Sequence, residues 1–339
     1  MTIEHPGKKQ IIDAGKTITD IGASADESLA AYKIANDWRV LHAVPLDLVE
    51  LDLREKCSTV DSRAFTSARL KRMESIASKL CQRDRMPGID LWSMQDLGGC
   101  RAILPTLEGV RRVAALYDAG RFEVKGKPKD YISEPKSSGY RGIHIIVKFK
   151  GAVPTGLDGM LIEVQLRSRQ QHIFATAVET VGYFTEQSLK SSIGQERWLR
   201  FFSLMGSLFS LQESGPVVPE TPATESELIA ELSPRAEALI GELQAFADAV
   251  KHTEAFRSHQ RSHYYVLIVD AVERSSEYHG FGQDEFDLAS MLCIQAEDEG
   301  RNAVLVSTES LSTLWQAYPN YFLDLNAFMR VVREIVHER

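Results

Sequence analysis

The chain has 339 residues, of which 44% are hydrophobic and 25% are charged, the proportions of an ordinary globular protein. No apolar run reaches the roughly 18 residues that a membrane helix needs, so we expect no membrane span. The first residues lack the apolar core of a signal peptide, and a cytoplasmic location follows as the expectation. The four cysteines are widely spaced and form no metal-binding pattern.

The formal net charge of −8 is unevenly distributed along the chain. Residues 61–150 contain 18 Lys and Arg against 10 Asp and Glu, whereas residues 216–339 contain 9 against 21. The basic middle of the chain favours a polyanionic ligand. The acidic C-terminal part is either solubilising or folds back on the basic part, and the charge pattern leaves both interpretations open.

The first 60 residues are predicted to be helical, with a helix over 26–42 and a shorter one after Pro45. Residues 62–83 are predicted to form one strong helix, because apolar residues recur there at helical spacing. Its apolar stripe consists of Leu70, Met73, Ala77 and Leu80.

From Gly99 the pattern changes to short strands alternating with helices. The expected strands are 99–105, 121–126, 141–150 and 160–168, and the expected helices are 107–120, 169–190 and 195–211. Residues 213–224 contain three prolines and are predicted to be a linker. A second α/β unit follows, with a long helix over about 225–258 and a strand at 263–272. A second strand or turn around 275–282, a helix and a strand at 302–307 come next. Two terminal helices separated by residues 317–322 complete the prediction.

The fold class expected from this order is α/β or α+β, with two domains. Residues 1–215 would form a mixed β-sheet flanked by helices, with a helical N-terminal extension. Residues 216–339 would form a smaller α/β regulatory domain.

Two acidic residues stand where a catalytic site could form. On the strand 160–168 the alternation of side chains puts Glu163, Gln165 and Arg167 on one face, which is either an ordinary solvated face or the wall of a cleft. Asp96 precedes a glycine pair and a strand, where it is either a turn residue or a ligand of Mg²⁺ shared with substrate phosphates.

Cationic and aromatic residues accompany these acids. Arg69, Lys71, Ser75 and Lys79 offer donors for a polyphosphate, although a basic helix face is usually only solvated. In the stretch 127–144, Tyr140 could stack on a base. The candidate phosphate ligands there are Lys129, Lys136 and His144.

Together these residues form four motifs: R-x-K-x₃-S-x₃-K (69–79), D-x₂-G-x-R (96–101), K-D-Y-I-x₂-P-K-x₂-G-Y-R-x-I-H (129–144) and E-x-Q-x-R (163–167). In this order they resemble the synthetase domain of RelA/SpoT proteins, over about residues 60–190. No His-Asp hydrolase signature precedes them, so the chain resembles a small member that only synthesises.

The resemblance implies transfer of pyrophosphate from ATP to a ribose 3′-hydroxyl with Mg²⁺ as cofactor. Arg69 and Arg101 match the pair that sandwiches adenine. Asp96 and Glu163 match the two catalytic carboxylates that bind the metal, and Glu163 could also help to deprotonate the attacking hydroxyl. The matches to the triphosphate ligands are Lys71, Ser75 and Lys79. The matches to the acceptor contacts are Lys129, Lys136, Tyr140, His144 and Gln165, with Tyr140 stacking on the base.

The acceptor divides this family. Alarmone synthetases use GDP or GTP, but residues 36–46 and 171–184 resemble a toxic branch that pyrophosphorylates the 3′ end of tRNA and stops translation. His172 stands where alarmone synthetases tend to carry an amide for guanine. The basic middle segment also suits a large RNA acceptor. Arg39 and His42 could extend that surface, or could simply pack or be solvated.

The C-terminal part resembles the antitoxin of CapRel-like fused toxin–antitoxin proteins, especially over residues 317–324. In that family Tyr318 and Tyr321 would form a Y-x-x-Y motif that blocks the ATP site; otherwise they are packing or capping residues. The resemblance implies an autoinhibited enzyme of anti-phage defence, triggered by a phage protein such as the major capsid protein.

Three functions remain as hypotheses: an autoinhibited tRNA pyrophosphokinase, a (p)ppGpp or (p)ppApp synthetase with an allosteric tail, and a degenerate synthetase fold that only binds RNA or nucleotides. The pair of acids Asp96 and Glu163 argues against the third, since a binding module needs no two metal-binding carboxylates beside a phosphate site.

Overall fold

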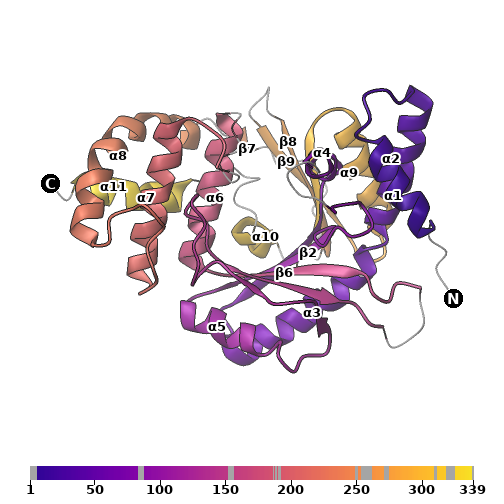
Figure 1. Ribbon diagram of the computed structural model, residues 1–339, viewed down its shortest axis with the longest axis horizontal. Helices are drawn as coiled ribbons and strands as arrows, with labels where there is room; N and C mark the ends of the chain where they lie inside the picture. The colour runs from indigo at the N-terminus through magenta and orange to yellow at the C-terminus, as the bar shows by residue number, and fades with distance from the viewer. Residues whose placement is uncertain are drawn as a thin grey trace.

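The computed structural model describes residues 6–82, 88–151, 156–185, 187, 189, 192–248, 251–252, 262–270, 275–308, 311–317 and 325–337. One curved sheet runs through the molecule, and helices flank it on both sides (Figure 1). The described helices are α1 (Lys8–Thr17), α2 (Ala25–Val40), α3 (Ala43–Val60), α4 (Met73–Cys81), α5 (Leu107–Ala115), α6 (Arg169–Phe184), α7 (Glu196–Gln212), α8 (Glu225–Asp248), α9 (Phe286–Asp298), α10 (Leu311–Ala317) and α11 (Asn326–His337).

The sheet has ten strands in the order β3-β5-β6-β2-β1-β10-β8-β9-β7, and β4 pairs with β5 beside this path. The strands are β1 (Phe65–Leu70), β2 (Gly98–Leu104), β3 (Glu123–Val124), β4 (Lys129–Asp130), β5 (Ile143–Lys148), β6 (Leu161–Ser168), β7 (Lys251–His252), β8 (Tyr264–Asp270), β9 (Ser275–Phe281) and β10 (Asn302–Ser307). The pairs β2–β6 and β7–β9 are parallel, whereas β1–β2, β5–β6 and β8–β10 are antiparallel. The expected mixed α+β fold is therefore confirmed.

The strands of the two expected domains join in the middle of this sheet. β1 pairs with β10 at two positions, Ala68 with Ser307 and Arg69 with Val306. By contrast, β1 pairs with β2 at six positions and β8 pairs with β10 at six. The short β1–β10 seam is where the C-terminal strands continue the sheet of the N-terminal ones.

Two apolar cores position the site. The first lies between the sheet and the helices α1 to α5, and it buries alternate strand residues such as Ile162, Val164 and Leu166 completely. The second lies among α6, α7, α8 and α11, which stand together at one end of the molecule (Figure 1). Because α8 and α11 share this core with α6 and α7, residues from both sides of the Pro-rich connector pack into one helical group.

The predicted helix over 62–83 is wrong in its first half. Residues 65–70 form β1, and only α4 is helical. Two neighbouring strands, β2 and β10, pair with β1 and supply backbone partners that override the local helical spacing. The strand predicted at 302–307 and the two terminal helices are confirmed. Residues 275–282, predicted as a strand or a turn, contain the strand β9.

The connector over 213–224 differs from a bare linker. Val218 is fully buried, and its amide N–H donates to Ser207 Oγ on α7 at 2.8 Å. The connector is therefore fastened to the helical group. Among the residues that the structure describes, none of the helices combines the length and apolarity needed to cross a membrane.

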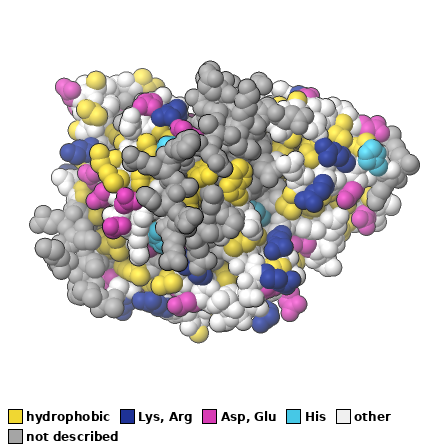
Figure 2. Space-filling model, turned by 180° about the vertical axis from the view of Figure 1, so that it is seen from behind, with side chains coloured by type: hydrophobic (Ala, Val, Ile, Leu, Met, Phe, Trp, Pro, Cys, Tyr) yellow, Lys and Arg dark blue, Asp and Glu magenta, His cyan; other side chains and the backbone are white. Residues whose placement is uncertain are grey.

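The acidic C-terminal part does fold back on the rest of the chain. Ion pairs join Arg39 to Glu297 at 3.2 Å and Arg200 to Glu231 at 2.7 Å. These arginines lie outside residues 61–150, the segment whose charge suggested the contact. On the face shown in Figure 2, Lys and Arg side chains are interspersed with Asp and Glu over the described residues, so no block of one charge covers that part.

Candidate active site

The register of the sheet gathers the polar motifs on one face. Arg101 on β2 lies opposite Gln165 on β6, which lies opposite His144 on β5. Two residues along the strands, Gly99 pairs with both Arg69 and Glu163. Since neighbouring residues in register project to the same side of a sheet, these side chains share the face opposite the first apolar core.

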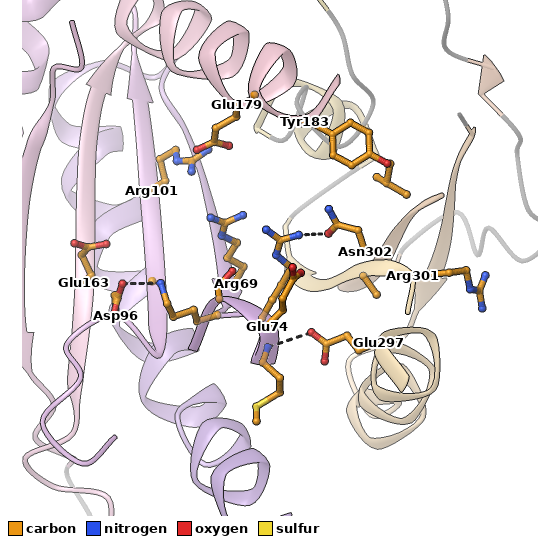
Figure 3. A pocket seen from close by; sticks show the side chains of 18 of the residues that line it. Arg69, Glu74, Asp96, Arg101, Glu163, Glu179, Tyr183, Glu297, Arg301 and Asn302 are labelled. Carbon is orange, nitrogen blue, oxygen red and sulfur yellow. Dashed lines mark hydrogen bonds and ion pairs between the residues drawn. The ribbon is translucent and has the colours of Figure 1, made fainter. Parts of the chain in front are cut away.

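A cavity of about 1020 Å³ opens on this face. It collects most of the residues that the sequence predicted for donor binding and catalysis, namely Arg69, Lys71, Ser75, Asp96, Arg101 and Glu163, together with the acceptor candidate Gln165. Its far wall comes from the C-terminal strands and α9, through Val269, Glu297, Arg301, Asn302 and Ala303 (Figure 3). The cavity therefore lies between the two halves of the sheet.

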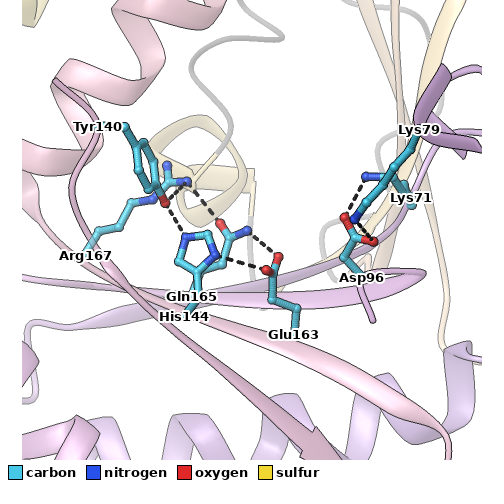
Figure 4. A network of polar contacts seen from close by, with 8 residues as sticks. All are labelled: Lys71, Lys79, Asp96, Tyr140, His144, Glu163, Gln165 and Arg167. Atoms are coloured by element: carbon cyan, nitrogen blue, oxygen red, sulfur yellow. Dashed lines mark hydrogen bonds and ion pairs between the residues drawn. The ribbon is translucent and has the colours of Figure 1, made fainter. Parts of the chain in front are cut away.

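Asp96 is bound by two lysines of the basic motif. Lys71 Nζ and Lys79 Nζ each lie 2.8 Å from one of its carboxylate oxygens (Figure 4). Burial alone would raise the pKa of Asp96, but the charges of Lys71 and Lys79 outweigh it and lower the pKa. Burial also lowers the pKa of Lys71, which Asp96 partly offsets. Asp96 is thus held as a carboxylate, and the lysines stay oriented toward the cavity.

Glu163 belongs to a second network, which extends to the acceptor motif (Figure 4). His144 Nδ1 donates to Glu163 Oε1 at 3.0 Å, and Gln165 Nε2 donates to Oε2 at 2.7 Å. The other ring nitrogen of His144 lies 2.5 Å from Tyr140 Oη, which also accepts a hydrogen bond from Arg167 Nη2 at 3.0 Å. One continuous chain of polar contacts therefore connects Tyr140 to Glu163.

Charge in this network is fixed by its partners. Burial opposes ionisation of Glu163, but the hydrogen bond and charge of His144 outweigh burial and lower the pKa of Glu163 strongly. Burial likewise lowers the pKa of His144, yet Tyr140 and Glu163 together raise it above the ordinary value. At neutral pH Glu163 is therefore a carboxylate and a weak base, better suited to neutralising and orienting charge than to holding a proton.

The remaining acceptor candidates are placed differently. Tyr140 is only 6% exposed, with the Lys136 ammonium 5.1 Å and the Arg167 guanidinium 5.1 Å from its ring centre. Tyr131, which the motif reading did not single out, packs edge-on against Tyr140 and carries Lys136 Nζ at 4.2 Å from its ring centre. Lys129 is exposed on β4, opposite His144. The structure brings Tyr140, His144 and Gln165 into the network, with Lys136 and Lys129 at its rim.

The two acids fit a magnesium ion. Asp96 and Glu163 line one cavity, Asp96 just before β2 and Glu163 on the adjacent strand β6. Mg²⁺ in phosphate-transfer sites commonly takes one or two protein carboxylates and completes its shell with water and phosphate oxygens. Among the described residues, none form a cluster of three or more His, Cys, Asp or Glu that could hold a metal ion.

The C-terminal part contacts the cavity near Arg101. Arg101 Nη1 donates to the backbone oxygen of Ala317 at 3.1 Å, and His172 Nε2 donates to that of Gln316 at 2.8 Å. Both oxygens belong to the last turn of α10, which lies between the sheet and the helical group (Figure 1). The predicted inhibitory pair, Tyr318 and Tyr321, follows directly but lies outside the described residues.

Several residues of the site escaped the sequence reasoning. Arg72, Glu179 and Tyr183 line the cavity, and in Figure 3 the Glu179 carboxylate points toward Arg101. Arg72 could have been found as a further cation beside Lys71. Glu297 and Asn302 carried no local signal, because their place depends on how the two halves of the sheet join.

Comparison with known proteins finds a family model that spans the motifs. Residues 68–188 match the family model described as "Region found in RelA / SpoT proteins". The chain is 29% identical over 119 residues to the GTP pyrophosphokinase YjbM of Bacillus subtilis, covering 35% of this chain and 56% of that protein. It is 30% identical over 109 residues to the probable GTP diphosphokinase RSH3 of Arabidopsis thaliana, covering 32% of this chain and 14% of that protein.

Among solved structures, the small alarmone synthetase 1 of Bacillus subtilis bound to its product pppGpp aligns with a TM-score of 0.44 at 22% identity. That alignment covers 52% of this chain and 93% of that structure. The chain thus spans about half the length of the first curated relative it matches, and a smaller share of the plant protein.

Proposed function

We propose, from the premise that residues 68–188 are a RelA/SpoT synthetase domain, that the protein is an ATP-dependent pyrophosphokinase. It would transfer the pyrophosphate of ATP to a ribose 3′-hydroxyl and release AMP. The observation that carries the proposal is the convergence of donor and catalytic motif residues, from Arg69 to Glu163, on one cavity of about 1020 Å³.

The donor half of the reaction rests on positioned cations. Arg69 and Arg101 would hold adenine between their guanidinium planes, a contact for which arginine is suited and lysine is not. Lys71, Ser75 and Lys79 would bind the triphosphate. Lys71 and Lys79 already converge on Asp96, so the cations are preorganised and need little rearrangement when charge develops on the phosphates.

Asp96 and Glu163 would hold Mg²⁺, which when bound neutralises phosphate charge. The protein itself orients the attacking group: Gln165 and His144 fix Glu163, so that its carboxylate can accept a hydrogen bond from the acceptor hydroxyl. Catalysis would then come mostly from placing the hydroxyl in line with the β-phosphorus and from electrostatic stabilisation.

The acceptor we favour is the 3′ end of tRNA. Lys125, Lys127, Lys129 and Lys136 are all exposed, and Lys129 and Lys136 lie at the rim of the acceptor network. A string of exposed lysines extends beyond what a mononucleotide would contact and suits a phosphate backbone. A second candidate acceptor is GDP or GTP, which the names of the curated relatives favour.

Autoinhibition by the C-terminal part belongs to the same proposal. The carbonyl oxygens at the end of α10 engage Arg101 and His172, groups that the donor or acceptor would use. Tyr318 and Tyr321 would extend this block into the adenine position. We keep residues 1–215 as the synthetase and 216–339 as the regulatory part, whose release by a phage protein would start translation arrest.

The test is a transfer assay on the full-length protein. Mg²⁺ and γ-³²P-labelled ATP are incubated with tRNA, GDP or GTP separately, with Glu163→Gln as the inactive control. Label in tRNA supports the favoured acceptor, and label in GDP or GTP replaces it with the second candidate. If a variant with a loosened α10 transfers label to none of the three, the pyrophosphokinase proposal is wrong.

A further inference from the structure

The turn between α9 and β10 reaches across the cavity to the start of α4. Glu297 Oε1 accepts a hydrogen bond from the backbone N–H of Met73 at 3.3 Å. Asn302 Oδ1 accepts a hydrogen bond from Arg72 Nη1, directly before the helix. Both contacts are drawn in Figure 3. Two side-chain oxygens from the C-terminal part therefore contact the N-terminus of α4. They lie about 225 residues away from it along the chain.

Glu297 is set firmly in this position. Its side chain is 10% exposed, and its second oxygen accepts a hydrogen bond from Arg39 Nη1 at 3.2 Å, on α2. Arg39 is itself 5% exposed and is also bound to Asn36 and to the backbone of Lys71. A buried carboxylate is tolerated only where its oxygens are satisfied, and here a helix N-terminus and a guanidinium satisfy them.

The groups that Glu297 and Asn302 engage are typical anion ligands. The first N–H groups of a helix attract negative charge, and Arg72, the N-cap residue before α4, makes no side-chain cap hydrogen bond. The guanidinium of Arg72 adds a second, independent donor, and it lines the same cavity as Lys71 and Ser75. Arg72 falls between the motif positions, so neither the motifs nor the proposed function assigns it a role.

We propose that Arg72 and the first turn of α4 bind phosphate oxygens of the donor nucleotide, and that Glu297 and Asn302 stand in for those oxygens in the closed protein. This inference rests on the proposed function and adds a phosphate ligand and a competitor to it. The contact lies apart from that of α10 with Arg101, so the C-terminal part would compete with the donor at both of its ends.

A base-free probe separates this site from the adenine end. Inorganic tripolyphosphate is titrated into full-length protein by calorimetry, because it carries the phosphates but cannot use the position that α10 blocks. Glu297→Gln removes the competing charge, keeps the side-chain volume and leaves Arg39 its contacts with Asn36 and Lys71. We expect tripolyphosphate to bind about tenfold more tightly, the scale of one charge-assisted hydrogen bond.

A matched control lies two residues away. Glu299 pairs with Arg301 at 2.6 Å and is 47% exposed, so Glu299→Gln removes the same charge from the same turn without touching α4. It should leave tripolyphosphate affinity unchanged. Asn302→Asp should change affinity in the opposite direction, about tenfold weaker, because a carboxylate would hold Arg72 more strongly than the amide does. In Glu297→Gln protein, adding Arg72→Gln should remove the gain.

Equal affinities of the Glu297→Gln and Glu299→Gln proteins would overturn the inference, as would a gain that survives Arg72→Gln. Should Glu297→Gln protein fail to fold, Asn302→Asp decides alone, and unchanged affinity there contradicts the site. Binding and transfer separate the two proposals. If tripolyphosphate affinity shifts but no pyrophosphate is transferred, only the pyrophosphokinase assignment is wrong. If pyrophosphate is transferred but tripolyphosphate affinity does not shift, only the proposal that Glu297 and Asn302 replace phosphate oxygens is wrong.

Discussion

Glu163 is held from two sides by neighbours that both donate to its carboxylate, His144 and Gln165. Such a carboxylate keeps its negative charge in a half-buried position because its hydrogen bonds replace those of water. Its charge, more than its shape, is therefore what the site uses. The neutral amide of glutamine would preserve the packing and lose that charge.

Glu163→Gln is accordingly expected to lower the rate of pyrophosphate transfer at least about 100-fold, the scale of losing one preorganised electrostatic group. Thermal unfolding should stay close to that of the wild type. The control is Glu123→Gln, which removes an exposed acid paired with Lys148 on the same sheet. Transfer by Glu163→Gln at the wild-type rate would exclude Glu163 from the mechanism.

His42 gives a pH dependence of stability. Its ring is buried, its Nδ1 donates to the backbone oxygen of Trp38 at 2.8 Å, and burial lowers its pKa to about 4. A histidine whose pKa is lower in the folded state binds a proton more readily when unfolded, so folding stability falls as pH drops from about 6.5 toward 4.

Between pH 7.5 and pH 5 this histidine should cost about 2 kcal/mol of unfolding free energy. His42→Asn, whose amide can still donate to Trp38, should show a smaller loss over the same range in urea titrations. An equal loss in both proteins would show that other groups control the acid sensitivity. Burial also lowers the pKa of His172, to about 3, so this histidine likewise reduces folding stability as the pH falls. It is present in both proteins, and the difference between them therefore reports on His42.

At this scale the sequence could predict candidate donor and acid residues that meet in one cavity, because each motif is local. The spacing of Lys71, Ser75 and Lys79, or of Glu163 and Gln165, depends only on short stretches of chain. It could not predict Glu297, because nothing near residue 297 encodes its distance from Met73. The burial of Tyr140 could not be predicted from the sequence either, because it depends on contacts with Arg167 and His144 from other parts of the chain.

Among the elements, β1 shows how pairing overrides local preference. Apolar residues recur at helical spacing over residues 62–83, which predicts one helix. Residues 65–70 nevertheless form a strand, because β2 and β10 pair with them on both sides. The break at Lys71 and Arg72 has a functional result, since the strand end carries Arg69 and the helix start carries Ser75 into one cavity. A continuous helix would have separated them along its axis.

The packing of α10 on the sheet is a second feature whose role can be tested. Leu314 and Ala317 are fully buried against β8 and β10, and this packing holds the α10 carbonyls over Arg101 and His172. Leu314→Ala removes buried contacts from the helix, at a typical cost of about 2–4 kcal/mol. Because 1.4 kcal/mol corresponds to a tenfold change in an equilibrium, basal transfer should rise about tenfold or more.

Leu267 provides the control, because it is 1% exposed in the same apolar cluster but belongs to β8. Leu267→Ala should lower thermal stability by a similar amount with a smaller effect on transfer. Equal activation by both variants would mean that general loosening, and not release of α10, exposes the donor site.

For the whole molecule, the packing revises how the C-terminal part should be removed. Cutting after residue 215 deletes α8 and α11, whose apolar residues complete the core around Phe201 and Phe209. The cut also leaves β1 without its partner β10. An uncovered apolar face and an open strand edge both favour association.

The fragment 1–215 is therefore expected to elute from a sizing column as aggregates or to be recovered mainly as insoluble protein. A chain that keeps α8 and α11 and replaces residues 251–317 with a flexible linker should aggregate less, because its helical core stays covered and only the edge of β1 stays open. Monomeric 1–215 at high concentration would contradict this expectation and make the simple truncation a valid test of toxicity.

The two-pair seam between β1 and β10 has a consequence for reversibility. So short a ladder would not hold two separate proteins together, but here α8 and α11 anchor the C-terminal strands at both of their ends. Re-forming the seam is then an intramolecular event, with an effective concentration on the order of millimolar. Under the proposed release, a partner that pulled β10 away from β1 would have to stay bound to keep the protein open, and the chain would close by itself once that partner left.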